Sequence, residues 1–524
     1  MLGGEMLFEP LERAPYAHDA SLYQSDPLGV VVPNGVEDVI HTLRYAAENG
    51  IPVHARGAAT GVSGGGIGPG LVVDFSRHFR RVVEIHHDRV VVQAGVVLDD
   101  LNARLAPMGR RIGPDPKGSD VATIGGIVGV NAIGPCSVRY GATGDVLDQL
   151  RVVFANGETA TLGQELWPAF DDEADDYKTN VVRKLGALVR KNLDLLMRFP
   201  RGGRAGYALA KAATGVGIHL PRLIAGSQGT LGLVTEATLR TVPIATAQVA
   251  ILLPFGRLLD ASEAAAAGLG SSLSACELFD WRLIHLAREA NPRFKEWIAD
   301  AAEAALVLLF EGDEPDEVAG RARALSARIA RQGKLVADPV LVNRRADCEL
   351  MIAVRKSVEP LLMRLGGPTR PTTLFEEVSV PPERLADLIQ RLQGLMREHN
   401  VSWVVDAHAA QGRLHPRPFL NLADEHDVGR LDSLSAAIFE AARDLGGTAL
   451  GAGLGSDSGA SFARKQLGAL LPVYREVKLA FDPLNILNPS AIVGDEGTPS
   501  SRLLRLPYSP PPPGEDATLD AGSG

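Results

Sequence analysis

The chain has 524 residues, 45% of them hydrophobic and 22% charged, and its formal net charge at pH 7 is −10. Such a composition describes an ordinary globular protein long enough for about two to three domains. The negative charge gives no support for nucleic-acid binding, and no apolar stretch is long enough to span a membrane.

Three cysteines, Cys136, Cys276 and Cys348, are scattered without C-x-x-C spacing. This spacing excludes a disulfide framework and an iron–sulfur ligand set within these residues. The N-terminal segment is acidic and broken by prolines, which is not typical of a signal peptide. We therefore expect a cytoplasmic protein, with any membrane contact made through a partner.

The first elements lead into a glycine-rich loop. Residues 1–25 form a lead-in, after which a strand at Val30–Pro33, a helix closed by Gly50 and a strand at Ile51–Val53 predict one βαβ unit. The loop that follows, Arg56–Asp74, reads RGAATGVSGGGIGPGLVVD. Glycines let backbone amides approach phosphate oxygens closely, so the loop favours phosphate binding; the alternative is a flexible linker.

A second stretch of small residues runs from Gly113 to Gly144. Between the two loops we expect strands at Arg81–His86 and Arg89–Gln93 and a helix at Leu98–Met108. Neither a G-x-G-x-x-G opening a helix nor a G-x-x-x-x-G-K-[ST] is present. Two loops depleted of carboxylates predict a dinucleotide held by main-chain groups.

The remainder of the first domain is expected to add a strand pair and a helix. Asn156-Gly157 is a strong turn signal between strands at Gln149–Phe154 and Gly157–Thr161, and a helix is expected over Asn180–Arg198.

After residue 244, strand-like and helical patterns alternate differently. Strands are expected at Gln248–Leu253, Leu273–Phe279, Ala305–Phe310, Thr372–Val380 and Val401–His408, with helices between them at Leu258–Leu269, Trp281–Ala290, Asp316–Gln332, Ala346–Leu365 and Pro382–His399. This order predicts an antiparallel sheet covered on one face by helices, and an α+β fold overall.

The segment from His408 to His415 reads HAAQGRLH. A two-residue turn centred on Gln411-Gly412 would pair the two histidines directly across a hairpin, about 4.5–5.5 Å apart at Cβ. That arrangement suits one metal ion or one substrate carboxylate, whereas the alternative is a pair of structural histidines at a sheet edge.

Several motifs, in the same order, resemble the vanillyl-alcohol-oxidase-type (PCMH-type) FAD flavoproteins. They include Arg56–Ser63, the run from Pro114 to Gly126, Arg139-Tyr140-Gly141, Gly226–Glu236 and Phe481–Ser490. The chain looks most like the D-lactate dehydrogenase/glycolate oxidase flavoprotein branch, and particularly the FAD part of its iron–sulfur-linked members. The resemblance covers about Tyr16 to Val493.

The resemblance implies a lead-in over 1–25, an FAD-binding PCMH-type domain of two subdomains over 26–244, a cap or substrate domain over 245–493, and a proline-rich tail over 494–524. It places FAD against Arg56, Gly57, Ala58, Ala59, Thr60, Gly61, Pro114, Asp115, Thr123, Gly125, Gly126, Asn131, Gly134, Ser137, Tyr140, Gly232 and Val234. Thr60 stands where covalently flavinylated relatives carry a histidine, which implies non-covalent FAD.

For catalysis the resemblance implies His408, His415 and Arg355, with Arg355 facing the substrate carboxylate. His408 and His415 are also the candidate metal ligands. Relatives add a Glu-His pair where this chain has Ala452 and Gly453, so the implied divalent-metal site is incomplete. Glu376 and Glu377 fall where relatives show an acidic pair or an aspartate.

The leading functional hypothesis is an FAD-dependent dehydrogenase that oxidises the CH–OH group of a small 2-hydroxy acid such as D-lactate or glycolate. A second hypothesis is a flavin-binding subunit that has lost or altered catalysis, and a third is an alcohol or sugar oxidase of the same fold. The resemblance also implies a separate iron–sulfur protein as electron acceptor, docked on the apolar segment Leu503–Tyr508; the alternative is that this segment is the remnant of a lost fusion.

Overall fold

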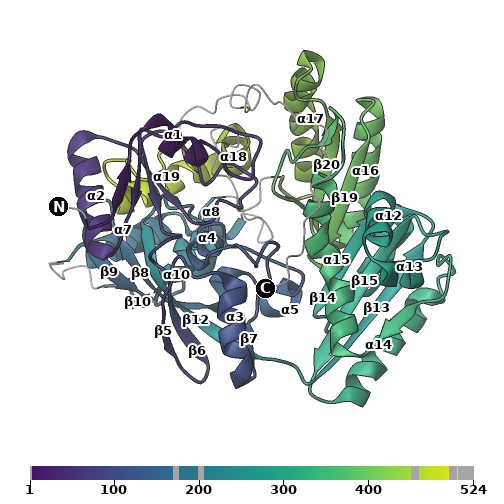
Figure 1. The fold of residues 1–524 in the computed structure, drawn as a ribbon. Helices are drawn as coiled ribbons and strands as arrows, with labels where there is room; N and C mark the ends of the chain where they lie inside the picture. The colour runs from purple at the N-terminus through teal and green to yellow at the C-terminus, as the bar shows by residue number, and fades with distance from the viewer. Residues whose placement is uncertain (1–2, 169–175, 199–205, 450–459, 495–503, 505–524) are drawn as a thin grey trace, which may run out of the picture.

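The computed structural model describes residues 3–168, 176–198, 206–449, 460–494 and 504. Up to about residue 243 the chain forms two main sheets, and a single larger sheet follows (Figure 1). In these described ranges, no helix combines the length and the apolar character needed to cross a membrane.

The first sheet has the strand order β1-β2-β4-β3. β2 (Gly29–Val32) and β3 (Val53–Arg56) both run parallel to β4 (Leu71–Asp74), and β1 (Glu5–Leu7) pairs antiparallel with β2. The predicted βαβ unit is present, and its helix α2 (Val36–Asn49) ends at Gly50 with a φ of 63°. β4 lies between the two strands of the unit, so the glycine-rich loop is a crossover from β3 to β4.

The second sheet is antiparallel, with the order β5-β6-β12-β8-β9 and with β7 paired to the far end of β12. Its strands are β5 (Val82–Ile85), β6 (Arg89–Gln93), β7 (Arg110–Ile112), β8 (Leu147–Val153), β9 (Thr159–Leu162) and β12 (Leu233–Pro243). A small hairpin, β10 (Gln164–Leu166) with β11 (Gly217–His219), stands apart.

The helices of this part are mostly short. They are α1 (Pro10–Arg13), α3 (Leu98–Leu105), α4 (Ile124–Gly129), α5 (Ser137–Tyr140), α6 (Thr143–Val146), α7 (Tyr177–Lys191), α8 (Leu193–Arg198), α9 (Leu209–Ala212) and α10 (Leu220–Ile224), with 3-10 turns at Ala14–Ala17 and Ala106–Met108. The helix expected over Asn180–Arg198 is split into α7 and α8 at Asn192.

The cap sheet is antiparallel throughout, in the order β16-β13-β15-β14-β19-β20-β17, with β18 also paired to β20. Its strands are β13 (Ala247–Phe255), β14 (Ala275–Asp280), β15 (Ala304–Gly312), β16 (Val340–Val342), β17 (Arg370–Pro371), β18 (Val378–Ser379), β19 (Trp403–His408) and β20 (Arg413–Leu420). The strand expected over Thr372–Val380 is therefore wrong for most of its length, because only its last part pairs with the sheet.

Helices cover both faces of the cap sheet, so the expectation of one covered face is wrong. α11 (Leu258–Ala267), α14 (Pro315–Ala330), α16 (Leu385–Glu398) and α17 (Glu425–Asp444) pack on one face. α12 (Trp281–Ala290), α13 (Pro292–Trp297) and α15 (Arg345–Met363) pack on the other. The physical reason lies in β13 and β15, whose nearly continuous apolar runs are buried on both sides.

The C-terminal segment returns to the FAD-binding side of the molecule. α18 (Ala460–Leu467) packs its Phe462 ring against Phe439 of the cap, whereas α19 (Leu471–Phe481) packs against α7. Beyond α19, Ile486 accepts a hydrogen bond from the Val53 amide at 2.8 Å. This segment therefore contacts β3, next to the start of the glycine-rich loop.

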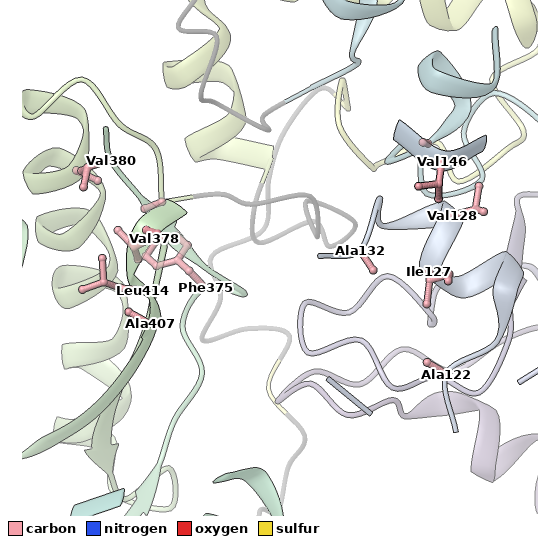
Figure 2. Packing of buried hydrophobic residues seen from close by; sticks show 14 of the residues in the cluster. Ala122, Ile127, Val128, Ala132, Val146, Phe375, Val378, Val380, Ala407 and Leu414 are labelled. Atoms are coloured by element: carbon pink, nitrogen blue, oxygen red, sulfur yellow. The ribbon is translucent and has the colours of Figure 1, made fainter. Parts of the chain in front are cut away.

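Buried aliphatic side chains from both domains flank the region between them. Figure 2 shows Ile127, Val128 and Val146 on the FAD-binding side, and Val378 and Leu414 on the cap side. Each fully buried side chain of this kind contributes about 1.5–3 kcal/mol to folding. The two groups lie on opposite sides of the region that contains the site described next.

Candidate active site

A cavity of about 770 Å³ lies between the two domains, within the range of about 300–1,000 Å³ common for small-molecule sites. One wall consists of the two glycine-rich loops and residues 227–234. The other consists of cap residues from α15, from the segment before β18 and from the β19–β20 hairpin. One cavity is therefore lined by the long glycine-rich loop, by the ATIGG run and by the two histidines.

Most of the residues predicted to hold FAD line this cavity. They are Arg56, Gly57, Ala58, Ala59, Thr60, Gly61, Thr123, Gly125, Gly126, Gly232 and Val234. The Arg56 guanidinium donates to the Gly66 carbonyl at 3.0 Å and lies over the Tyr16 ring, so it ties down the far end of the loop. A Cβ on Gly57 would lie 2.1 Å from Thr123 Oγ1, because the two loops touch there.

The other predicted FAD residues, Pro114, Asp115, Asn131, Gly134, Ser137 and Tyr140, lie outside the cavity lining. They support its walls instead. Asp115 accepts a hydrogen bond from the Cys136 amide at 2.8 Å, Ser137 Oγ accepts one from the Gly134 amide at 3.0 Å, and Asn131 accepts one from Gly144. Burial raises the pKa of Asp115 and raises that of the Cys136 thiol well above its usual value.

A buried lysine is hydrogen-bonded to the backbone of the loop from Gly226 to Gly232. Lys478 of α19 donates to the Thr230 carbonyl at 2.9 Å and to the carboxylate of Asp482 at 2.5 Å. Burial lowers the pKa of Lys478, and the adjacent Asp482 opposes that shift. Asn488 of the FDPLNILNP motif also donates to the Gln228 carbonyl at 3.0 Å, so the motif contacts the loop although 260 residues of sequence separate the two residues.

The residues present fit FAD. The cavity is lined by backbone-rich loops, and a Cβ added at Gly65 would enter open space with only Gln228 Oε1 within reach, at 3.6 Å. Close approach of main-chain amides to a large ligand needs such a cradle.

The hairpin that carries the two histidines has a different register from the one expected. His408 pairs with Arg413 and His415 pairs with Asp406, so the direct pairing of the histidines is wrong. The connection is four residues long, Ala409–Gly412, with a 3-10 turn and with Gly412 at a φ of 66°. Gln411-Gly412 cannot easily form a two-residue turn, which favours Asn, Asp or Gly first.

The two histidines nevertheless meet. A shift of two residues leaves both side chains on the same face of the sheet, and their rings lie edge to face with centroids 5.4 Å apart. Glu277 of β14 lies directly opposite His408, and Asp406 and Arg417 share that face. It is the face covered by α12, α13 and α15, and the FAD-binding domain covers its remaining part.

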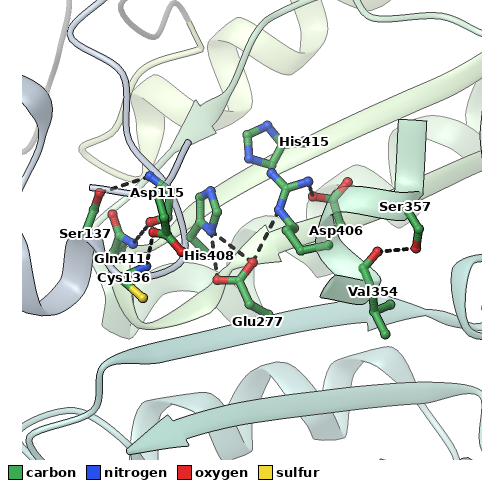
Figure 3. Close-up of polar contacts among 12 residues, drawn as sticks. Asp115, Cys136, Ser137, Glu277, Val354, Ser357, Asp406, His408, Gln411 and His415 are labelled. Carbon is green, nitrogen blue, oxygen red and sulfur yellow. Dashed lines mark hydrogen bonds and ion pairs between the residues drawn. The ribbon is translucent and has the colours of Figure 1, made fainter. Parts of the chain in front are cut away.

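A buried charge cluster surrounds the histidines (Figure 3). Arg355 of α15, 3% exposed, lies 3.3 Å from Glu277 and 2.6 Å from Asp406, and Arg417 lies 2.5 Å from Asp406. Burial favours the neutral form of Asp406, but Arg355 and Arg417 prevail and hold its pKa well below its ordinary value. The predicted catalytic Arg355 thus lines the cavity with its charge already paired.

Each histidine has its Nδ1 fixed by a partner. His408 Nδ1 donates to the Glu277 carboxylate, at 2.8 and 3.0 Å to the two oxygens, and His415 Nδ1 donates to the Glu376 carbonyl at 2.8 Å. Burial, followed by the nearby Arg355, lowers the pKa of His415 well below its usual value. The Nε2 atom of His415 is buried and makes no hydrogen bond to any described residue.

The described ranges contain no cluster of three His, Cys, Asp or Glu side chains that could hold a metal ion. Ala452 and Gly453 lie outside the described residues. Glu376 and Glu377 line the cavity, where Glu377 pairs with Arg413 at 3.0 Å. In the predicted docking segment only Leu504 is described, and it is buried beside Tyr23, in contrast to the exposure expected for that segment.

Sequence reasoning missed Glu277, Asp406, Arg417 and the lysines Lys117 and Lys356. A signal for the first two was present, since each is a carboxylate in the interior of a strand whose residues are mostly apolar. Lys356 also joins the domains, because its Nζ donates to Ser119 Oγ at 2.9 Å.

Two protein families match separate parts of the chain. Residues 27–163 match the FAD binding domain family, and residues 244–492 match the family of C-terminal domains of FAD linked oxidases. The chain is 30% identical to D-2-hydroxyglutarate dehydrogenase of Escherichia coli (strain K12), over 93% of this chain and 50% of that protein. It therefore spans about half the length of such curated relatives.

Shorter relatives match over almost their whole length. Glycolate oxidase subunit GlcD of Bacillus subtilis (strain 168) is 28% identical over 91% of both chains. D-lactate dehydrogenase of Archaeoglobus fulgidus is 26% identical over 88% of this chain and 91% of that protein.

Solved structures show the same fold at low identity. p-Cresol methylhydroxylase aligns with a TM-score of 0.68 and 13% identity over 94% of both chains. 4-Ethylphenol oxidase from Gulosibacter chungangensis aligns with a TM-score of 0.66 and 15% identity over 95% of both chains. The chain therefore combines a domain of the FAD binding domain family with a C-terminal domain of the FAD linked oxidases, in a PCMH-type fold.

Proposed function

We propose that this protein oxidises the CH–OH group of a small 2-hydroxy acid, of the D-lactate, glycolate or D-2-hydroxyglutarate type, and passes the electrons to a separate acceptor. The observation that carries the proposal is that one cavity joins the glycine-rich loops to the buried imidazoles of the cap. The relatives named above support this substrate class.

Bound FAD would supply the acceptor for a hydride, and the residues lining the glycine-rich wall would hold it without a covalent bond. The chain's own part is to bind the substrate, exclude water and take up the hydroxyl proton. Lys117 and Lys356 line the cavity and supply positive charge for a carboxylate. Arg355 and Arg417 are balanced by Glu277 and Asp406, so their contribution to anion binding depends on a partial exchange of partners.

A second candidate, oxidation of a neutral alcohol, is favoured by that same pairing of Arg355 and Arg417. A substrate without a carboxylate would leave the buried charge cluster undisturbed, and unpairing buried charges is costly.

The test is anaerobic bleaching of the flavin absorbance of the purified protein. The panel contains D- and L-lactate, glycolate, D- and L-2-hydroxyglutarate, and the neutral alcohols ethanol and benzyl alcohol. Bleaching by one enantiomer of a hydroxy acid supports the leading proposal, and bleaching by the neutral alcohols alone supports the second. Loaded protein that none of these compounds bleaches would argue for a flavin-binding subunit without this chemistry.

A further inference from the structure

The N-terminal segment that precedes β2 lies against the glycine-rich loop. Within residues 16–23, called the strap below, the Ala20 amide donates to the Ala59 carbonyl at 3.0 Å. The neighbouring Asp19 accepts a hydrogen bond on Oδ2 from the Gly66 amide at 3.2 Å. A Cβ built on Gly66 would lie 3.5 Å from the Cβ of Ala59. The strap therefore binds the loop where the loop folds back on itself.

The strap is tied down at both of its ends. At one end, the Tyr16 hydroxyl donates to the buried Asp74 carboxylate at 2.9 Å, and the Tyr16 carbonyl accepts from Arg56 at 3.3 Å. At the other end, Tyr23 pairs with Leu504, and both side chains are buried. Because its ends are tied, the middle of the strap loses less conformational entropy when it contacts the loop.

The two oxygens of Asp19 have separate partners. Oδ1 accepts hydrogen bonds from the Ser21 amide at 2.9 Å and from the Ser21 hydroxyl at 2.5 Å, whereas Oδ2 accepts from Gly66. Hydrogen bonds to an ionised carboxylate are roughly twice as strong as neutral ones. Ala20 lines the cavity and Asp19 does not, so the Asp19 carboxylate acts on a bound ligand only through the loop.

The loop has a conformation that needs outside support. Ala59 has a φ of 54°, which a residue other than glycine rarely adopts and which persists only where surrounding contacts impose it. The Ala59 carbonyl and the Thr60 amide belong to one trans peptide, so they point in opposite directions. Since the carbonyl is held by Ala20, the Thr60 amide faces away from the strap. The strap thus orients a main-chain donor of a residue that lines the cavity.

A carboxylate beside this loop also has an opposing effect, because it repels the phosphates of FAD. Burial raises the pKa of Asp19, and the Arg56 guanidinium acts in the opposite direction by favouring the carboxylate. The charge of Arg56 therefore offsets much of the repulsion. The two effects of Asp19 predict opposite results for its removal: repulsion predicts tighter FAD binding, and support of the loop predicts weaker binding.

We propose that Asp19 is a positioning residue for FAD, whose carboxylate acts with the Ala20 amide to hold the glycine-rich loop in the conformation that binds the cofactor. This inference concerns the cofactor and holds for any substrate of the enzyme. Support of the loop outweighs repulsion because the Gly66 amide and the Arg56 guanidinium both reduce the negative charge that a phosphate would meet.

The first test needs neither FAD nor substrate. Hydrogen–deuterium exchange of the FAD-free protein, read by mass spectrometry, compares the parent with Asp19→Ala and Asp19→Asn. We expect peptides from residues 57–70 to exchange about tenfold faster or more in Asp19→Ala, and to change less in Asp19→Asn because an amide keeps one acceptor oxygen. Peptides from the cap should exchange as in the parent, which shows that the variants fold. Unchanged exchange of the loop in Asp19→Ala would overturn the proposal.

Asp26→Asn is the matched control. Asp26 is a carboxylate three residues beyond the strap that accepts from Gln24 at 3.5 Å, and it makes no hydrogen bond to the described residues of the glycine-rich loop. Its variant should match the parent in loop exchange and in FAD affinity.

The second test is FAD titration followed by fluorescence. We expect Asp19→Ala to weaken FAD binding at least about tenfold, the size of effect that one hydrogen bond to a charged group produces, and Asp19→Asn to weaken it less. The melting temperature of the FAD-free protein should be the same in all variants. FAD binding in Asp19→Ala as tight as in the parent, or tighter, would overturn the proposal. A lower melting temperature with faster exchange throughout the FAD-binding domain would also overturn it, because Asp19 would then be a general structural residue.

Discussion

Asp406 is the residue on which most of the buried cluster depends. Its two carboxylate oxygens face Arg355 and Arg417, and its backbone pairs with both Phe279 and His415. Removing one partner of a buried ion pair costs about 3–5 kcal/mol because the other charge is left uncompensated. On the cap side, buried ion pairs hold the side chains that line the cavity. On the opposite side, glycines leave room for a ligand because they have no side chains.

A substitution of Gly65 tests whether the glycine-rich loop binds FAD. Its neighbour Gly64 has a φ of 79°, so a substitution there would be strained, but Gly65 has no such requirement. Because a side chain at residue 65 would enter the cavity, we expect Gly65→Leu to weaken FAD binding at least about tenfold, or ~1.4 kcal/mol. The melting temperature of the FAD-free protein should not change.

The measurement is FAD titration followed by fluorescence, with Gly215→Leu as the control. Gly215 is exposed, meets nothing within 4 Å at a built Cβ and lies away from the cavity. Unchanged FAD affinity in Gly65→Leu would show that the loop does not cradle the cofactor.

Thr60 permits a prediction about the form of the cofactor. Its side chain lines the cavity and carries no imidazole that could bond to the flavin ring. We expect acid precipitation of the purified protein to release all FAD into the supernatant, as measured by absorbance. A yellow pellet that retains flavin after washing would contradict non-covalent binding.

At the scale of elements, β14 links the cap sheet to its helices and to the site. Its last residue, Asp280, accepts hydrogen bonds at 3.0 Å from the Leu283 amide at the start of α12 and from the Val405 amide of β19. One carboxylate therefore caps a helix and tethers the strand that carries Asp406 and His408. This position buries the carboxyl group of Asp280, and burial raises its pKa to about 7.

This pKa predicts a pH-dependent stability. A folded-state pKa above the ordinary 3.8 means that the folded protein binds the proton more tightly than the unfolded chain does. The resulting stabilisation is complete below about pH 4, falls as the pH rises through about 7, and amounts to about 4 kcal/mol at most.

Asparagine at position 280 cannot titrate, so we expect the difference in melting temperature between the parent and Asp280→Asn to shrink as the pH rises from 5 to 8. Differential scanning calorimetry of both proteins, saturated with FAD, measures this trend. Parallel curves for the two proteins would mean that Asp280 does not titrate in this range.

At the scale of the whole molecule, polar contacts join the two domains around the cavity. Glu311 of the cap, with a side chain 1% exposed, lies 3.2 Å from Arg111, accepts from the Tyr140 hydroxyl at 3.2 Å and receives a third bond from Gln248. Gln411 of the hairpin connection donates to the Gly134 carbonyl at 3.3 Å. These contacts link the FAD-binding domain to the cap beside the cavity.

The Glu311–Arg111 pair can be tested by a double-mutant cycle. Each single variant, Glu311→Leu or Arg111→Met, leaves a charge unpaired at the interface, so we expect each to lose about 3 kcal/mol of unfolding free energy. The double variant should lose less than the sum of the two, because no lone charge remains. Urea unfolding measures the cycle, and additive losses would show that the two side chains are not coupled.

Much of this architecture follows from the local sequence. The glycine-rich loops, the helix ending at Gly50, the alternation of cap strands and helices, and the presence of two histidines on one hairpin are all short-range features. Backbone conformation and burial depend on neighbouring residues, so patterns over a few positions are enough to predict them. The order of the motifs also predicted the cofactor and the family. This was possible because each loop that would bind FAD is one continuous stretch of sequence.

Tertiary structure alone decided which side chains complete the site. Glu277 reaches His408 across 131 residues of sequence, and Lys478 reaches Thr230 across 248. It also decided that helices cover both faces of the cap sheet and that the hairpin closes with four residues. A buried charge must be compensated, but nothing near it in the sequence says which distant residue supplies the opposite charge, because strand order and register set that choice.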